Sequence, residues 1–315
     1  MSSAVIAVVL LLVAFLVFTF MGQSQVAEPY YLQDQWWINF ASTGVWAKVA
    51  SFVLILLEAV FAAVLTQKYQ LLYKATWLPL FFYGMVCLLF PVQLNILPSH
   101  LAMLFLLLSI NSLFQAQGKE KTLPELFSAG FFLGMAGLFQ NQSLLFVPTL
   151  IIGIFSFKPS RIIDYLQFLI GVLMPLYFYG ILAFMQPSLP GLIQEDLKPL
   201  ISMEWRPMGD ELNALMILGF TLVFLLFVFI RLQQNFFRNT VKVRKYQQFM
   251  LVYFLNAAFL VAFSPQPLYQ NIPFLAGPMS VYLTYYFLPD KRKVLKEFIF
   301  ILMLGLWMNA HFGWI

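Results

Sequence analysis

The first acidic residues of the chain stand in a stretch rich in aromatic and amide side chains, EPYYLQDQWWINF at residues 28–40. Glu28 and Asp34 are its two charged residues, and Trp36 and Trp37 follow Asp34 closely. A carboxylate in such surroundings can act as a general base towards an acceptor hydroxyl, or hold a divalent metal together with a donor phosphate. The alternative is that both acids are ordinary solvated loop residues.

Amide side chains recur along the chain, and three of them, Gln140, Asn141 and Gln142, are consecutive. Amides offer hydrogen-bond donors and acceptors together, and aromatic rings offer flat stacking faces. That combination suits neutral polyhydroxyl groups such as sugars, although aromatic belts at membrane surfaces have a similar composition. On the sugar hypothesis, the predicted substrate-binding residues are Trp36, Trp37, His100, Gln140, Asn141, Gln142, Arg206 and Tyr269.

Glu58 lies in the apolar run ILLEAVF, where an ionisable side chain is costly and is a functional candidate by default. Lys48, the nearest cation in sequence, is too far along a helix to pair with it directly. One hypothesis is that Glu58 binds a proton or a polar substrate. The alternative is a structural residue that is protonated, or hydrogen-bonded to a polar group of another helix.

The remaining chemistry-bearing residues predict no metal site and identify no cofactor. His100 and His311 are the two histidines, no acids cluster beside them, and Cys87 is the single cysteine. Metal-ligand spacings such as HExxH and CxxC are missing, as are the Walker, GxSxG and GxGxxG motifs. Nucleotide chemistry of the kind found in soluble enzymes is therefore not expected.

The elements that position these residues are predicted to be membrane helices. The chain is 62% hydrophobic and 10% charged, and residues 4–21 and 214–230 contain no ionisable side chain. One soluble core cannot hide so much apolar surface. We therefore expect an all-α polytopic membrane bundle, a single integral membrane domain over residues 1–315 without a separate soluble domain. Its net charge of +5 is attributed to membrane orientation, so no nucleic-acid partner is expected.

Apolar runs of membrane-spanning length predict about eleven crossings, with residues 4–21 retained as the first helix. All but three of the 18 cations fall on one side of this map. By the positive-inside rule that side faces the cytoplasm, which places the N-terminus inside and the C-terminus outside. The predicted crossings start near residues 4, 45, 77, 99, 124, 143, 165, 213, 249, 272 and 297.

One predicted hairpin is too short to cross the membrane twice. Glu125 and Lys158 enclose 32 uncharged residues, whereas two crossings of a roughly 30 Å core need about 40. We expect the tip at Gln140–Gln142 to be recessed, where its amides must face a wet cavity open to the outside or protein partners. Gly130, Gly134 and Gly137 recur at helical spacing and are expected to let the arms pack closely.

The run Ser128–Pro148, SAGFFLGMAGLFQNQSLLFVP, followed by a basic turn, Gly171 and Pro175, resembles the central helices of GT-C type glycosyltransferases. That resemblance implies a lipid-linked phosphate sugar donor and a catalytic acid in the first outer loop, where this chain has Glu28 and Asp34. Three amides replace the basic residue often found after the glycine-rich helix of that family.

The whole chain is also similar in length and layout to an uncharacterised family of bacterial inner-membrane proteins, classed only as a domain of unknown function. This similarity implies the bacterial inner membrane as the location and brings no activity with it.

Two functions from different classes follow. The first is a GT-C-like transferase that uses a lipid-linked sugar in an outward-facing polar cavity, with Asp34 and Glu28 as catalytic residues. The second is a non-catalytic membrane subunit or carrier that binds a lipid, a glycan or a partner protein on the outer face. The missing catalytic motifs and the acidic segment Glu195–Glu211 favour the second.

Overall fold

The computed structural model describes residues 45–72, 74–88, 97–119, 122–157, 161–185, 240–263, 268–288 and 297. Every regular element in these ranges is helical and none is a strand, so the all-α prediction is confirmed for this part of the chain. The helices are α3 (Val45–Lys68), α4 (Leu78–Cys87), α5 (Leu97–Ala116), α6 (Leu123–Phe139), the 3₁₀ helix η2 (Asn141–Phe146), α7 (Val147–Phe157), α8 (Ile162–Met185), α11 (Val241–Phe263) and α12 (Leu268–Phe287).

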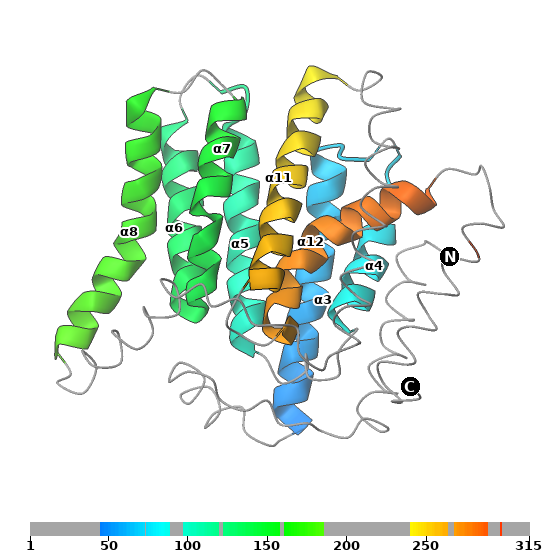
Figure 1. The fold of residues 1–315 in the computed structure, drawn as a ribbon, viewed down its shortest axis with the longest axis horizontal. Coiled ribbons are helices and arrows are strands. Elements are labelled where there is room, and N and C mark those ends of the chain that lie inside the picture. The colour runs from blue at the N-terminus through cyan, green and yellow to red at the C-terminus, as the bar shows by residue number, and fades with distance from the viewer. Residues whose placement is uncertain are drawn as a thin grey trace.

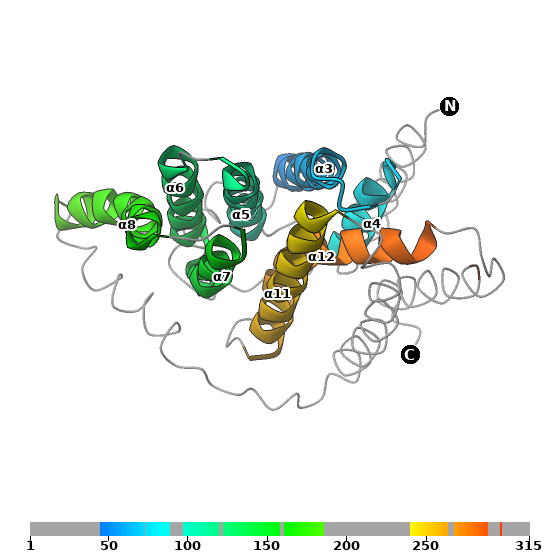
Figure 2. The ribbon, with the colours of Figure 1, turned by 90° about the horizontal axis from the view of Figure 1, so that it is seen from above.

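The helices form two layers. Figures 1 and 2 show α8, α6, α5 and α3 side by side in one row, and each neighbouring pair in this row is in contact. On one side of the row, α7 packs against α5 and α11, and α11 packs against α12. The short helix α4 lies between α3 and α12 and contacts both of them. The buried core therefore runs between the two layers.

Three helices in the described ranges are long and apolar enough to cross a membrane, namely Val49–Lys68, Pro98–Ala116 and Ile162–Ile181. Helices begin within several residues of eight predicted starts, from the one near residue 45 to the one near residue 272. The segments predicted from residues 4 and 213, and all but residue 297 of the last one, lie outside the described ranges. The number of crossings and the orientation remain predictions.

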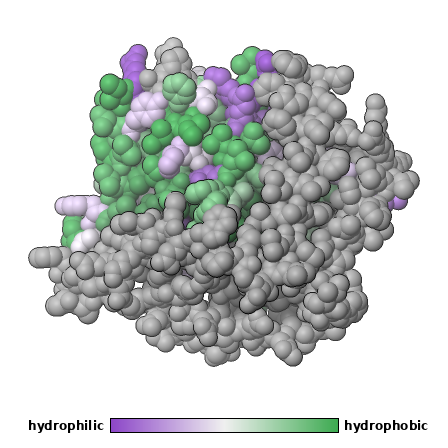
Figure 3. Space-filling view, viewed as in Figure 1, coloured by the Kyte–Doolittle hydropathy of each residue, from purple (hydrophilic) through white to green (hydrophobic). Residues whose placement is uncertain are grey.

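Cations gather at one end of the bundle, which we call the cationic end. Lys68 ends α3, Lys119 follows α5, Arg161 precedes α8, and Lys245 in the second turn of α11 reaches the carbonyl of Phe157 at the end of α7 at 3.4 Å. Figure 3 shows a largely hydrophobic surface over the described helices, with hydrophilic patches mostly along its upper edge, where the cationic end lies.

An aromatic cluster packs just inside the cationic end and joins the two layers. Phe114 of α5 lies with its ring centroid 4.5 Å from that of Tyr246 of α11, 4.9 Å from that of Tyr69, and 5.6 Å from that of Phe157. The Tyr246 hydroxyl also donates to the Phe114 carbonyl at 3.2 Å. Edge-on aromatic contacts at these distances stabilise by about 0.5–1.5 kcal/mol each beyond the area they bury.

Two helices end in a left-handed residue. After α3, Gln70 has φ 51°, and the amide of Leu71 donates to the carbonyl of Thr66 at 3.0 Å, as in a Schellman cap. After α5 the left-handed position is Gly118, with φ 82°. Glycine takes this conformation freely and glutamine does not, so the end of α3 carries a backbone cost that the end of α5 avoids.

The glycine face of α6 packs on α8. A Cβ at Gly130 would lie on the carbonyl oxygen of Phe168, and one at Gly134 on that of Val172, so the two helix backbones are in direct contact. We expected this face to join the two arms of the short hairpin, and for Gly130 and Gly134 that expectation is wrong. The second arm, α7, packs on α5 and α11 instead, and Gly137 alone of the three α6 glycines meets η2.

Candidate functional site

Glu58 points into the bundle because of its position on α3. Val53, Leu57, Val60 and Val64 recur at helical spacing and form an exposed stripe on this helix. Glu58 lies on the opposite face, where its side chain has no exposed surface. A carboxyl group held in this way must find hydrogen-bond partners inside the protein, because an unpaired buried charge is costly.

Two polar side chains from neighbouring helices meet Glu58, and we call the three residues the Glu58 cluster. The Tyr83 hydroxyl of α4 donates to Glu58 Oε2 at 2.8 Å, and His100 Nδ1 of α5 lies 3.1 Å from the same oxygen. All three residues are fully buried. The other carboxyl oxygen, Oε1, is buried and has no hydrogen-bond partner.

Local sequence explains how α4 and α5 supply these partners. Pro79 lies in the first turn of α4, where its missing amide hydrogen removes no helical hydrogen bond. Tyr83 and Cys87 are four residues apart on α4, so they share the face towards α3. His100 lies in the first turn of α5, which places it beside Glu58 near the middle of the longer helix α3.

Cys87 and Tyr253 complete the ionisable surroundings of Glu58. Both lie within electrostatic reach of its carboxyl group. Tyr253, on α11, donates its hydroxyl to the carbonyl of Phe274 at 2.9 Å and lies 3.5 Å from the sulfur of Met103. Ionisable groups from α4, α5 and α11 therefore surround the carboxyl.

The chemistry open to the Glu58 cluster is the storage of a proton. Tyr83 donates to Oε2, His100 Nδ1 contacts the same oxygen, and Oε1 has no hydrogen-bond partner. A proton added at Oε1 makes the carboxyl neutral. Neutral groups are cheaper to bury than charged ones. Across the described ranges, no three residues of the types His, Cys, Asp and Glu come together in a group that could hold a metal ion.

A second polar cluster surrounds Gln140, Asn141 and Gln142, which we call the amide tip. Gln140 is extended between α6 and η2, and its Nε2 donates to Asn271 Oδ1 at 3.2 Å and to the Gln270 carbonyl at 3.4 Å. Gln140 and Gln142 are buried and Asn141 is half-buried. The tip thus faces protein partners in the first turn of α12, one of the two environments expected for it.

The predicted site residues are only partly brought together. Glu28, Asp34, Trp36, Trp37 and Arg206 lie outside the described ranges. Tyr269 lies in the first turn of α12, adjacent to Gln270 of the amide-tip contact. His100, predicted among the residues of an outer cavity, is instead fully buried on Glu58. Its place in the first turn of an apolar helix turns it into the bundle, where a neutral imidazole needs a polar partner.

Tyr83 was missed by the sequence analysis, and the pairing of Glu58 with His100 was not foreseen. A search for ionisable groups within the predicted crossings would have suggested that pairing, since Glu58 needs a partner and His100 is one of the chain's two histidines. Tyr83 gives no comparable signal, because the chain contains 14 tyrosines and most can be explained by membrane interfaces.

Comparison with known proteins identifies a family. Neither the curated proteins nor the solved structures give a match to the chain. A family model described as a family of unknown function, DUF6427, matches residues 36–312. The matched region contains the Glu58 cluster and the amide tip, whereas Glu28 and Asp34 precede it. The predicted similarity to an uncharacterised family is confirmed, and the chain belongs to the DUF6427 family.

Proposed function

We propose that the chain is a multi-pass protein of the bacterial inner membrane, with its cationic end in the cytoplasm. Its support is the apolar surface of α8, where Ile162 is 80% exposed, Leu173 60% and Tyr177 65%. Together with the exposed stripe of α3, this surface is larger than a soluble protein leaves open to water. A reporter fused at the C-terminus should be active only outside the cytoplasm, and activity inside the cell would contradict the orientation.

Within that bundle, we propose proton binding by the Glu58 cluster as the function, in a membrane carrier or subunit whose conformation responds to the bound proton. The observation that carries the proposal is the fully buried carboxyl whose Oε2 has two partners and whose Oε1 has none. Ionisable groups inside membrane proteins are rare because of their cost, and they mark proton or ion pathways.

The two states of the site differ by one proton. In the unloaded state Glu58 is a carboxylate that accepts from Tyr83 and contacts His100 Nδ1 through Oε2. In the loaded state the proton resides on Glu58 Oε1, and the carboxyl is neutral. Charges interact strongly inside a low-dielectric bundle, so this change in charge is the means by which proton binding would alter helix packing.

Infrared difference spectroscopy on the protein in lipid nanodiscs tests this proposal directly. Stepping the pH downwards should produce the carbonyl stretch of a protonated, buried carboxyl, shifted in D2O. Glu58→Gln should remove that band. Glu125→Gln should leave it unchanged, because Glu125 pairs with Lys119 at 2.5 Å at the partly exposed start of α6. An identical band in Glu58→Gln would show that Glu58 does not take up the proton.

The lipid-linked sugar transferase is the second candidate, and the amide tip is what favours it. Ser143 Oγ and Asn271 Nδ2 beside the tip are buried and have no hydrogen-bond partner, so they are open to a polar ligand. The carboxylates would be supplied by Asp34 and Glu28. Loss of glycan transfer from a lipid-linked donor in Asp34→Asn and Glu28→Gln, with normal protein abundance, would support it, and unchanged transfer would exclude both acids.

The molecules that bind to the protein distinguish the carrier or subunit hypothesis from the transferase hypothesis. A subunit should co-purify with a partner protein in fixed stoichiometry, and a carrier with a lipid or glycan that it does not alter. A lipid-phosphate sugar that is consumed on addition of an acceptor would favour the transferase.

A further inference from the structure

Two small cavities lie next to each other between α3, α11 and α12. The first offers about 10 Å³ to the centre of a water molecule and is lined by Leu71, Gln247, Met250, Val281, Tyr282 and Tyr285. The second offers about 20 Å³, and its lining includes Thr66 and Tyr253 as well as Leu71, Met250 and Val281. The three shared residues form the wall between the cavities. Each cavity is large enough for one water molecule.

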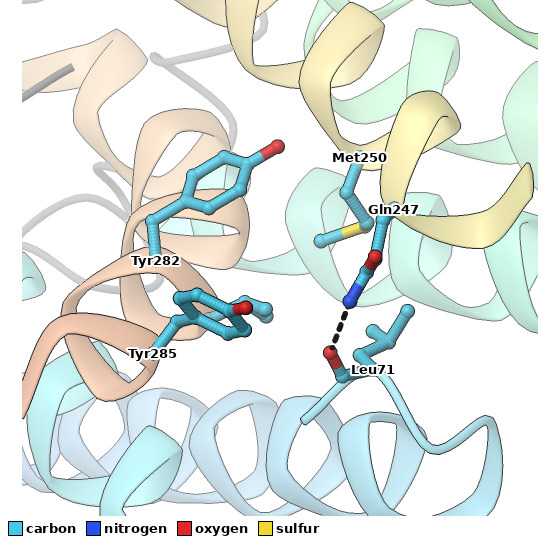
Figure 4. A pocket seen from close by; sticks show the side chains of 6 residues that line it. Leu71, Gln247, Met250, Tyr282 and Tyr285 are labelled. Atoms are coloured by element: carbon cyan, nitrogen blue, oxygen red, sulfur yellow. Dashed lines mark hydrogen bonds between the residues drawn. The ribbon is translucent and has the colours of Figure 1, made fainter. Parts of the chain in front are cut away.

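The first cavity lies just inside the cationic end. Gln247 Nε2 donates to the Leu71 carbonyl at 3.1 Å, which ties the second turn of α11 to the connection after α3. Figure 4 shows the Tyr282 and Tyr285 side chains reaching from α12 towards Gln247 and Leu71 across this space. The Tyr282 hydroxyl is buried, lines the cavity and has no hydrogen-bond partner. A buried hydroxyl in that position is a ready ligand for a water molecule.

The second cavity extends towards the Glu58 cluster. Ala62, one helical turn from Glu58 on the same face of α3, lines it together with Tyr253. Thr66, on the same helix as Glu58 and two turns further towards the cationic end, lines it as well. The remaining lining side chains are apolar, so this cavity is expected to be dry most of the time and to hold water only transiently.

We propose that these cavities form the path by which a proton from the cationic end reaches Glu58, an inference that rests on the proposed proton-binding function. A water molecule held by Tyr282 in the first cavity receives the proton as hydronium. Transient water in the second cavity carries it past Ala62, one helical turn from Glu58, to Glu58 Oε1. No bond other than O–H bonds is made or broken, and the cluster gains one proton. The rate depends both on how often Tyr282 holds the proton-carrying water and on how often water enters the second cavity.

The experiment is a rapid pH jump on the protein in nanodiscs, with the Glu58 carboxyl band followed in time. Tyr282→Phe removes only the unpartnered hydroxyl and should slow the rise of the band about tenfold, the effect of one lost hydrogen bond on the proton's route. Val281→Thr adds a hydroxyl to the wall shared by both cavities and should quicken the rise. The final amplitude should be the same in both variants.

Tyr246→Phe is the matched control, since Tyr246 is buried in the same end of α11 but donates to the Phe114 carbonyl. Its rate should equal that of the unaltered protein. Unchanged rates in both Tyr282→Phe and Val281→Thr, with a normal band, would overturn the path and leave proton binding intact. If the unaltered protein gave no Glu58 band at any pH, the proposed function and the path would both be overturned.

Discussion

The contact between Glu58 and His100 is best tested by replacing each partner alone and then both together. His100→Phe keeps a ring of similar size in the first turn of α5 and removes the nitrogen 3.1 Å from Glu58 Oε2. Glu58→Met keeps an unbranched side chain in α3 and removes the acceptor that His100 and Tyr83 share. The double variant leaves the Tyr83 hydroxyl without its carboxyl acceptor.

The magnitudes follow from complete burial. Removing one partner of a fully buried polar contact to a charged group leaves the other partner unsatisfied and destabilises by about 3 kcal/mol, whereas apolar replacement of both partners is often close to neutral. The orphaned Tyr83 hydroxyl adds about 1–3 kcal/mol to the cost of the double variant. We therefore expect each single variant to lose about 3 kcal/mol, the double variant to lose about 1–2 kcal/mol, and the coupling energy to exceed about 2 kcal/mol.

Reversible unfolding in mixed micelles of a mild detergent and dodecyl sulfate, followed by tryptophan fluorescence, measures these differences. Glu125→Gln is the control for removing a carboxylate that is paired but partly exposed, and it should lose less than about 1 kcal/mol. Strict additivity of the two single variants, to within about 0.5 kcal/mol, would refute the pairing. It would mean that the two side chains do not stabilise each other in the folded protein.

Three further predictions use the same unfolding measurement. Gly130→Ala should lower the free energy of unfolding by about 2 kcal/mol or more, because the added Cβ would meet the α8 backbone. Gly180→Ala should be neutral or stabilising, because nothing lies within 4 Å of the added Cβ. Equal effects of the two substitutions would contradict the close packing. Gln70→Gly should gain about 0.5–1 kcal/mol by relieving the left-handed φ of 51°, and a loss would argue against that conformation. Ser109→Ala removes a 2.7 Å hydrogen bond from α5 to the Ala129 carbonyl of α6 and should lower the free energy of unfolding by about 0.6 kcal/mol. Ser128→Ala is its control and should change the free energy of unfolding very little, because the exposed Ser128 hydroxyl donates within its own helix.

The helical segments were predictable because apolar run length depends only on local composition. The start predicted near residue 77 agrees with α4 at Leu78, and the one near residue 124 agrees with α6 at Leu123. The neighbours of each helix were not predictable in this way. Gly130 and Gly134 predict a close helix contact, but nothing in the local sequence indicates whether the neighbouring helix is α7 or α8. That choice depends on how η2 turns the chain, which is a property of the assembled bundle.

The site was predictable as single residues and not as a cluster. Glu58 stands out because a carboxyl inside an apolar run has few explanations. Its pairing with His100 spans 42 positions and requires the intervening α4 to fold back against α3. The amide tip was expected to face protein partners or a wet cavity, and Asn271, the partner of Gln140, lies 131 positions away. Long-range contacts of this kind leave no periodic trace in the sequence.

The Glu58 cluster and the amide tip are linked through the start of α12. Asn271 in its first turn accepts from Gln140, and the carbonyl of Phe274, one turn further, accepts from Tyr253, which lies within reach of Glu58. Two prolines inside α12 remove backbone hydrogen bonds from these same turns, which lowers the resistance of the helix to bending. We therefore predict that a change in charge at Glu58 alters the segment of α12 that holds the amide tip. Were a polar ligand to bind at the tip with the same affinity in Glu58→Gln as in the unaltered protein, at every pH, α12 would not couple the two clusters.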